Sequence, residues 1–171
     1  SMFTMHGSIY LLMKTEGTLH LMLRKWVKQT IGIFILVYVL VTVFTFFSMP
    51  HMLVHLLEKP WLLLLPLVSL ICIGNIVWQI SKNQDGWAFI SSCLAISSLI
   101  ALFALGSFPV LIRSSLNPEK FSLLAHTAAS SPLTLKILLL IVLIGLPFVL
   151  GYGYYIYRVF RGKVRLDKSS Y

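Results

Sequence analysis

The chain has 171 residues, of which 58% are hydrophobic and only 11% charged, and its mean hydropathy is +0.89. Because soluble domains carry about 25% charged residues, this composition excludes an ordinary soluble protein and predicts an integral membrane protein. The formal net charge of +9 comes from Lys and Arg grouped at the ends of apolar runs, a pattern typical of membrane flanks, so no nucleic-acid partner is expected.

The first apolar run, residues 2–13, is too short to cross a bilayer. As a helix it extends roughly 20 Å, against a hydrocarbon core of about 30 Å. It lacks the basic start and the cleavage site of a signal peptide, so we expect the second half of a membrane helix from a longer protein. His6 lies in this run. It is a haem ligand by type, but a lone helical histidine is more often a packing or hydrogen-bonding residue.

Four longer apolar runs follow, and each is long enough to span a membrane. They cover residues 31–48, 61–80, 87–108 and 133–157. We expect the charged residues 14–30 to form a connection, Pro66 to kink the second run, and Pro147 to bend the fourth. Cys72 and Cys93 are expected to be buried thiols. The predicted fold is all-α, a polytopic transmembrane bundle with four complete spans and a partial N-terminal helix in one membrane domain, 1–171.

The distribution of Lys and Arg predicts the orientation of these spans. One side receives four in residues 14–30, Lys82, and five after Tyr157. The other side receives only Lys59, Arg113, Lys120 and Lys136. The positive-inside rule therefore places the C-terminus in the cytoplasm and the connection 108–136 outside.

Ionisable residues give little sign of chemistry within the membrane. The five carboxylates all lie in connections or in the tail, whereas proton or ion paths usually contain a buried ionisable residue. His51, His55 and Glu58 share a helical face, but such spacing on an interfacial helix is common by accident. No histidine falls in a complete span. We therefore expect this chain alone to bind no metal and no haem.

Two groups of residues in the spans are candidates for helix contacts. A stripe of small side chains in the third span contains Ala88, Ser91, Ala95 and Ser98. Small residues allow membrane helices to approach closely, and the stripe suits either a partner interface or packing within this chain. Asn75 and Gln79, four residues apart in the second span, are expected to form interhelical hydrogen bonds, with a water-lined path as the other interpretation.

The outer connection, residues 108–136, holds the remaining candidates, Arg113, Glu119 and His126. Its apolar centre, residues 121–125, argues against disorder, so we expect an ordered segment at the membrane surface. The three polar residues suit contacts with a lipid headgroup, a quinone or a partner loop, and they equally suit a solvated cap. The residue types alone leave these alternatives open.

Several short motifs along the whole chain resemble one known family. They are Met5-His-Gly, Lys14-Thr-Glu-Gly, Trp87-Ala-Phe, Phe108-Pro, Ser114-Ser115, Ala128-Ala-Ser-Ser-Pro-Leu-Thr-Leu135 and Tyr157-Arg-Val-Phe-Arg-Gly-Lys-Val164. In this order they resemble subunit II of the cytochrome bd ubiquinol oxidases, and within it the C-terminal half. The family's subunit II has eight membrane helices, which agrees with four spans and a partial helix here.

The resemblance implies a bacterial respiratory oxidase that oxidises quinol, reduces dioxygen to water and generates a proton gradient without pumping. It implies that haem b, haem d and the quinol-oxidising loop belong to subunit I, the expected partner, in the bacterial cytoplasmic membrane. This chain would then support subunit I, carry no catalytic or cofactor-binding residue, and contact membrane lipids and a structural quinone. The alternative is a fragment of a multi-pass transporter or permease, with Pro66 and Pro147 marking broken helices.

Overall fold

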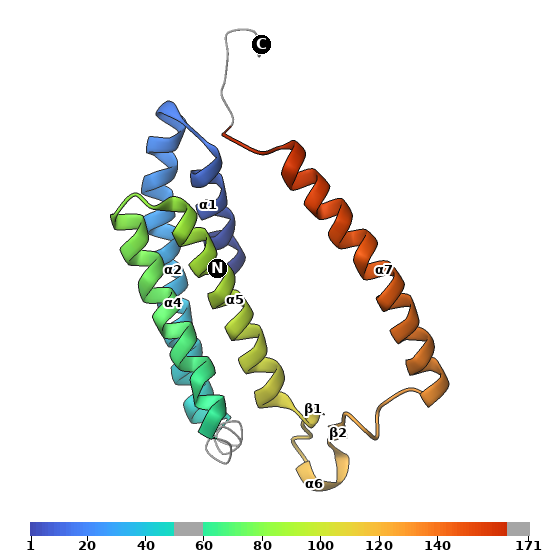
Figure 1. Cartoon of the computed structure of the whole chain (residues 1–171). Helices are drawn as coiled ribbons and strands as arrows, with labels where there is room; N and C mark the ends of the chain where they lie inside the picture. Colours follow the sequence, from blue (N-terminus) through green and yellow to red (C-terminus); the bar gives the residue numbers. More distant parts are fainter. Residues whose placement is uncertain (50–59, 164–171) are drawn as a thin grey trace. The chain divides into compact units, whose positions relative to one another are not determined.

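The computed structural model describes residues 1–49 and 60–163 (Figure 1). Within these residues four helical segments are long and apolar enough to cross a membrane. They are α2 (Gly17–Ser48), the segment Pro60–Ser81, α5 (Asp85–Ser107) and α7 (Pro132–Val159). A shorter helix, α1 (Met2–Lys14), precedes them. The predicted all-α membrane bundle is therefore confirmed, whereas His51, His55 and Glu58 lie outside the described residues.

The chain divides into two compact units, which we call unit 1 and unit 2. Among the described residues, unit 1 comprises 1–49, 60–107 and Lys163, and unit 2 comprises Phe108–Gly162. In unit 1, α1 packs against α2 and α5, and α4 (Leu64–Ser81) packs along α5. The apolar core of unit 1 is supplied by these four helices.

Helix α2 begins at Gly17 and not at the predicted Ile31. Gly17 has a φ of +71°, a conformation that glycine adopts without strain, and this permits the tight turn after α1. Beyond it, the buried side chains Leu23, Val27, Ile31 and Phe34 form one continuous stripe at helical spacing. The prediction that residues 14–30 form a connection was wrong, because packing along this stripe extends the helix through the charged residues.

The second span starts differently from the prediction. A single 3₁₀ turn, Pro60–Leu63, leads into α4. Pro66 is the third residue of α4. The first four amide N–H groups of an α-helix have no acceptor within the helix, so a proline at this position costs no hydrogen bond of α4. Pro66 therefore lies where the 3₁₀ turn passes into α4, and it does not kink the middle of the helix.

The prediction that Cys72 is buried is confirmed, but Cys93 is exposed. Cys93 was predicted wrongly because α5 buries only the face with Ser91 and Ala95.

Unit 2 contains a small hydrogen-bonded segment followed by a long helix. Strands β1 (Val110–Ile112) and β2 (Leu123–Leu124) pair antiparallel, and the short helix α6 (Pro118–Phe121) lies between them. The segment is therefore ordered, as its apolar centre predicted. Helix α7 starts at Pro132 after Ser131, whose side chain accepts a hydrogen bond from the amide of Thr134. No residue of α7 is buried.

Candidate functional site

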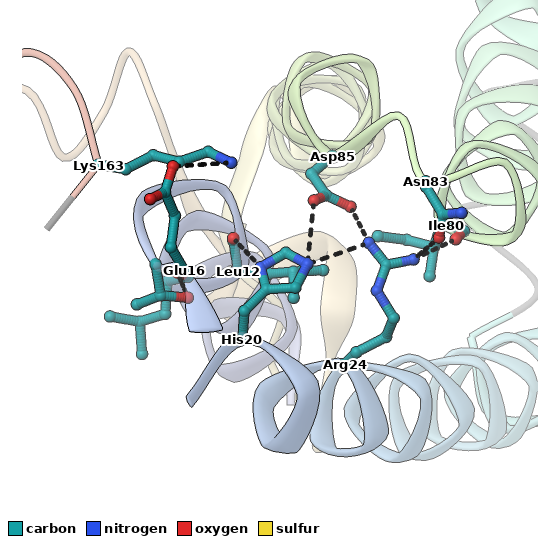
Figure 2. A network of polar contacts seen from close by, with 10 residues as sticks. Leu12, Glu16, His20, Arg24, Ile80, Asn83, Asp85 and Lys163 are labelled. Atoms are coloured by element: carbon teal, nitrogen blue, oxygen red, sulfur yellow. Dashed lines mark hydrogen bonds and ion pairs between the residues drawn. The ribbon is translucent and has the colours of Figure 1, made fainter. Parts of the chain in front are cut away.

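A polar cluster at one end of unit 1 joins α2 to the turn between α4 and α5 (Figure 2). We call it the Arg24 cluster. It contains His20 and Arg24 of α2, Asn83 of the turn, and Asp85, the first residue of α5. In Figure 2 the side chains of His20 and Arg24 both point from α2 toward Asp85. The cluster thus unites parts of the chain that are 61 residues apart.

Arg24 makes three contacts with the α4–α5 turn. Its Nη2 donates a hydrogen bond to Asp85 Oδ1 at 2.9 Å, and its Nη1 donates to the main-chain oxygen of Ile80 at 3.3 Å and to the side-chain oxygen of Asn83. The Arg24 and Asp85 side chains are 19% and 16% exposed, so this ion pair is largely removed from water. Asp85 also places negative charge at the N-terminus of α5, where the helix dipole favours it.

His20 connects the same cluster to α1. Its Nδ1 donates a hydrogen bond to the main-chain oxygen of Leu12 at 3.1 Å, because a carbonyl oxygen can only accept. In the neutral ring Nε2 is then the acceptor. It lies 3.5 Å from Arg24 Nη2 and 3.9 Å from Asp85 Oδ2. One cluster therefore holds α1, α2 and α5 together at this end of the unit.

Two consecutive serines of α5 bind the helices on its two sides. Asn75 Nδ2 of α4 donates a hydrogen bond to Ser91 Oγ at 2.7 Å, and Ser92 Oγ lies 2.7 Å from His6 Nδ1 of α1. The ring of His6 also stacks on Phe89, with 4.8 Å between centroids. Unpaired polar groups are costly in hydrocarbon, so both contacts hold helices against α5. His6 has the hydrogen-bonding and packing role that is more common for such a histidine.

The small side chains of the α5 stripe are buried within this chain. Ala88 and Ala95 are fully buried, as is nearly all of Ser91 and Ser98. The hydrogen bond from Asn75 to Ser91 places this face of α5 toward α4, and small side chains permit the close approach. Burial within unit 1 leaves almost none of this stripe accessible to another chain.

Gln79 lies one helical turn from Asn75 but differs from it in its contacts. The residue is 7% exposed, and its Oε1 has no hydrogen-bond partner among residues 1–49 and 60–163. The structure therefore brings Asn75 into an interhelical hydrogen bond, and it leaves the oxygen of Gln79 without one.

The candidates in the connection 108–136 belong to unit 2 and take no part in these contacts. Arg113 and His126 are exposed in unit 2, and the side chain of Glu119 is not described. The segment is held by main-chain groups, such as the amide of Ala125, which donates to the oxygen of Pro109 at 2.8 Å. Neither Arg113 nor His126 is therefore needed to hold the strands together.

The described residues favour helix-to-helix contacts over a metal centre. Across residues 1–49 and 60–163, no three His, Cys, Asp or Glu side chains are grouped so that they could hold a metal ion. In the Arg24 cluster, each ionisable side chain lies within 4 Å of another member of the cluster. Such an arrangement fixes the positions of helices.

Sequence reasoning missed the Arg24 cluster because its members fall in two separate charged segments. Part of the signal was present. His20 and Arg24 are four residues apart on one helical face, beside the buried Leu23 and Val27. The sequence pattern does not show that α2 lies beside the start of α5, which places Asp85 next to Arg24.

Comparisons with known proteins give the family. The family model for cytochrome bd terminal oxidase subunit II matches residues 1–160. The chain is 27% identical over 161 residues to the Bacillus subtilis protein named cytochrome bd ubiquinol oxidase subunit 2, covering 93% of this chain and 46% of the relative. It is 29% identical over 118 residues to a Haemophilus influenzae protein named "Probable cytochrome oxidase subunit 2", covering 67% of this chain and 31% of that relative.

The chain therefore spans less than half the length of these curated relatives. The family match nevertheless extends over nearly all of the chain and includes α1, α2, α4, α5, α7 and the paired strands. This chain belongs to the cytochrome bd terminal oxidase subunit II family.

Proposed function

We propose that this chain is part of subunit II of a cytochrome bd-type quinol:oxygen oxidoreductase in the bacterial respiratory chain. In this role it supports the haem-bearing subunit I, which oxidises quinol and reduces dioxygen to water. The observation that carries the proposal is the family match over residues 1–160. The family assignment leaves the transporter alternative without support.

The contacts within unit 1 suit a supporting subunit. The Arg24 cluster and the two α5 serines fix α1, α2, α4 and α5 through groups that are already paired. Helices in a bilayer associate without a hydrophobic driving force between them, so packing and polar contacts decide their arrangement. A subunit built in this way offers a fixed surface to its neighbour. Haem b and haem d belong to that neighbour in this proposal, and they supply the oxygen chemistry.

Helix α7 adds an apolar surface of a different kind. Its 28 residues include none that are buried within the chain, and the helix is long and apolar enough to cross a membrane. In the membrane such a helix contacts lipid tails, subunit I or a structural quinone. The proposal assigns α7 to these outer contacts, and it assigns Arg113, Glu119 and His126 to an external cap beside subunit I.

The orientation follows from the number of spans and the charges at their ends. The described residues contain four candidate spans, and an even number of crossings supports the same side of the membrane for residues 14–30 and the C-terminal end. That side carries most of the Lys and Arg, and the positive-inside rule makes it the cytoplasm. The proposed location is the bacterial cytoplasmic membrane, with the C-terminus in the cytoplasm.

The function is tested by producing subunit I together with the full-length subunit II, with and without residues 1–171. The haem d absorbance and the quinol oxidase activity of the membranes are recorded for both. Loss of the haem d band without this segment is the expected result. Full haem d assembly without residues 1–171 would refute the supporting role.

A pair of single substitutions gives a finer test that keeps the chain intact. Arg24→Ala removes the centre of the Arg24 cluster, whereas Gln29→Ala removes an exposed polar side chain further along α2. The expected outcome is that haem d content per membrane protein falls for Arg24→Ala and is retained for Gln29→Ala. Equal haem content in both variants would argue that the cluster plays no part in assembly.

A further inference from the structure

The first part of α2 has an outward face that mixes cations with apolar side chains. Lys25 and Lys28 are exposed, and within residues 1–49 and 60–163 neither forms a hydrogen bond or an ion pair. The neighbouring Leu21, Met22 and Trp26 are also exposed, at 66%, 58% and 59%. A face toward water would be polar, and a face toward lipid tails would lack cations. The mixture suits the boundary between headgroups and acyl chains.

The length of α2 places these lysines at that boundary. Its 32 residues extend about 48 Å, longer than a hydrocarbon core of about 30 Å. If the apolar part from Ile31 to Ser48 fills the core, Lys28 and Lys25 lie about 4.5 and 9 Å beyond it along the helix. Phospholipid headgroups occupy this layer.

Aromatic residues mark the same level on three helices. Trp26 of α2, Trp78 of α4 and Trp87 of α5 are all more than half exposed. The contacts of Arg24 with Ile80 and Asp85 hold these ends of the helices together. Exposed tryptophans gather at membrane–water interfaces, so they independently indicate that Lys25 and Lys28 lie at headgroup depth.

Two other cations at this end of unit 1, among the described residues, are already engaged. Arg24 pairs with Asp85, and the ammonium of Lys82 lies 3.8 Å from the ring centroid of Trp78. Lys25 and Lys28, three residues apart, are left to face the membrane with two positive charges. An anionic headgroup complements them, whereas a zwitterionic one offers no net charge.

We propose that Lys25 and Lys28 form a binding site for the phosphate of an anionic phospholipid, with Trp26 at the level of its headgroup. The site rests on the membrane location of the chain and not on the oxidase function. It gives this part of α2 a preference for one class of membrane lipid.

The test uses the full-length subunit purified in its membrane complex. It is reconstituted in vesicles of about four parts phosphatidylcholine to one part phosphatidylglycerol. A photoactivatable diazirine is carried on the phosphatidylglycerol in one sample and on the phosphatidylcholine in the other. Mass spectrometry then measures the lipid adducts on the peptide that covers residues 17–30. The preference is the ratio of the two adduct yields after each is divided by the mole fraction of the lipid that carries the diazirine.

In the natural protein we expect the phosphatidylglycerol adduct to exceed the phosphatidylcholine adduct by at least about five-fold, the effect of one lysine near the surface. The preference should fall to near unity in the Lys25→Gln/Lys28→Gln variant and decrease as salt is raised. The matched control, Lys120→Gln/Lys136→Gln, removes two charges from unit 2 and should retain the preference. Equal labelling by the two lipids in the natural protein would overturn the proposal, as would an unchanged preference in the first variant. If that variant does not fold, the lipid ratio and its salt dependence in the natural protein decide the question.

Discussion

The guanidinium of Arg24 lies 2.9 Å from the carboxylate of Asp85, although 61 residues separate them in the chain. The pair joins the helical hairpin of α1 and α2 to the hairpin of α4 and α5. Because lipid tails are as apolar as leucine, burial of apolar side chains drives helix association only weakly in a bilayer. Polar contacts such as this ion pair therefore contribute a larger share of the free energy of helix association than they would in a soluble protein.

Breaking this pair should destabilise unit 1. Arg24→Ala leaves Asp85 without its cation at a largely buried position. We expect a loss of about 2 to 3 kcal/mol, below the about 3 to 5 kcal/mol found for fully buried pairs. The loss is measured as a change in the free energy of unfolding of the full-length subunit in mixed detergent.

The exchange variant Arg24→Asp/Asp85→Arg separates the effect of the ion pair from the effect of removing a side chain. It restores opposite charges at the same two positions, so it should be more stable than either single variant. If the exchange variant is less stable than both single variants, the ion pair is not the source of the stability.

The hydrogen bond from Asn75 to Ser91 should contribute a smaller amount. A double-mutant cycle with Asn75→Leu and Ser91→Ala is expected to give a coupling energy of about 0.6 kcal/mol, the average for polar contacts between membrane helices. Ser81→Ala is a suitable control, because Ser81 is exposed and bonds only the main chain of its own helix. A coupling energy of zero would mean that the two residues do not interact in the membrane.

The face of α5 that meets α4 should not accept larger side chains. Ala95 is fully buried, so Ala95→Leu should lower the stability by about 1 to 3 kcal/mol through overpacking. Ala104→Leu is the matched control, because Ala104 is exposed on the same helix. Thermal melting of the purified subunit compares the two variants, and equal melting temperatures would contradict the close packing of α4 and α5.

The polar residues of the outer connection should affect assembly and not turnover. Arg113 and His126 are exposed, so replacing either by Ala is expected to preserve the paired strands. The content of assembled haem should decrease, and the quinol oxidase rate per haem should stay the same. Normal haem content with a lost rate would instead indicate a catalytic role for this connection.

Much of the fold was predictable because membrane helices are encoded locally. An apolar run of sufficient length specifies a span, and this gave α5 and α7 to within about two residues at each end. Helix α2 was predicted too short because its first half carries Arg24, Lys25 and Lys28. The charges in residues 14–30 suggested a connection between spans. The helix nevertheless begins at Gly17, because Leu23 and Val27 pack in the core.

The candidate site was harder to predict because its contacts are made across space. The pattern of small residues identified the packing face of α5, but it did not reveal that α4 covers this face. Asn75 was predicted to bond another helix, and its partner Ser91 became visible only in the structure. The pairing of His6 with Ser92 depends on the way α1 folds back against α5, which no local pattern specifies.

That last contact has a consequence for biosynthesis. His6 and its partner Ser92 are separated by 86 residues. At about 5 to 20 residues per second, the ribosome needs roughly 4 to 17 seconds to make the serine after the histidine. During this interval α1 has been made, but His6 lacks its hydrogen-bonding partner, the hydroxyl of Ser92. The hydrogen bond can form only after α5 has been made. The early part of the chain thus reaches its final state only after a much later part has entered the membrane.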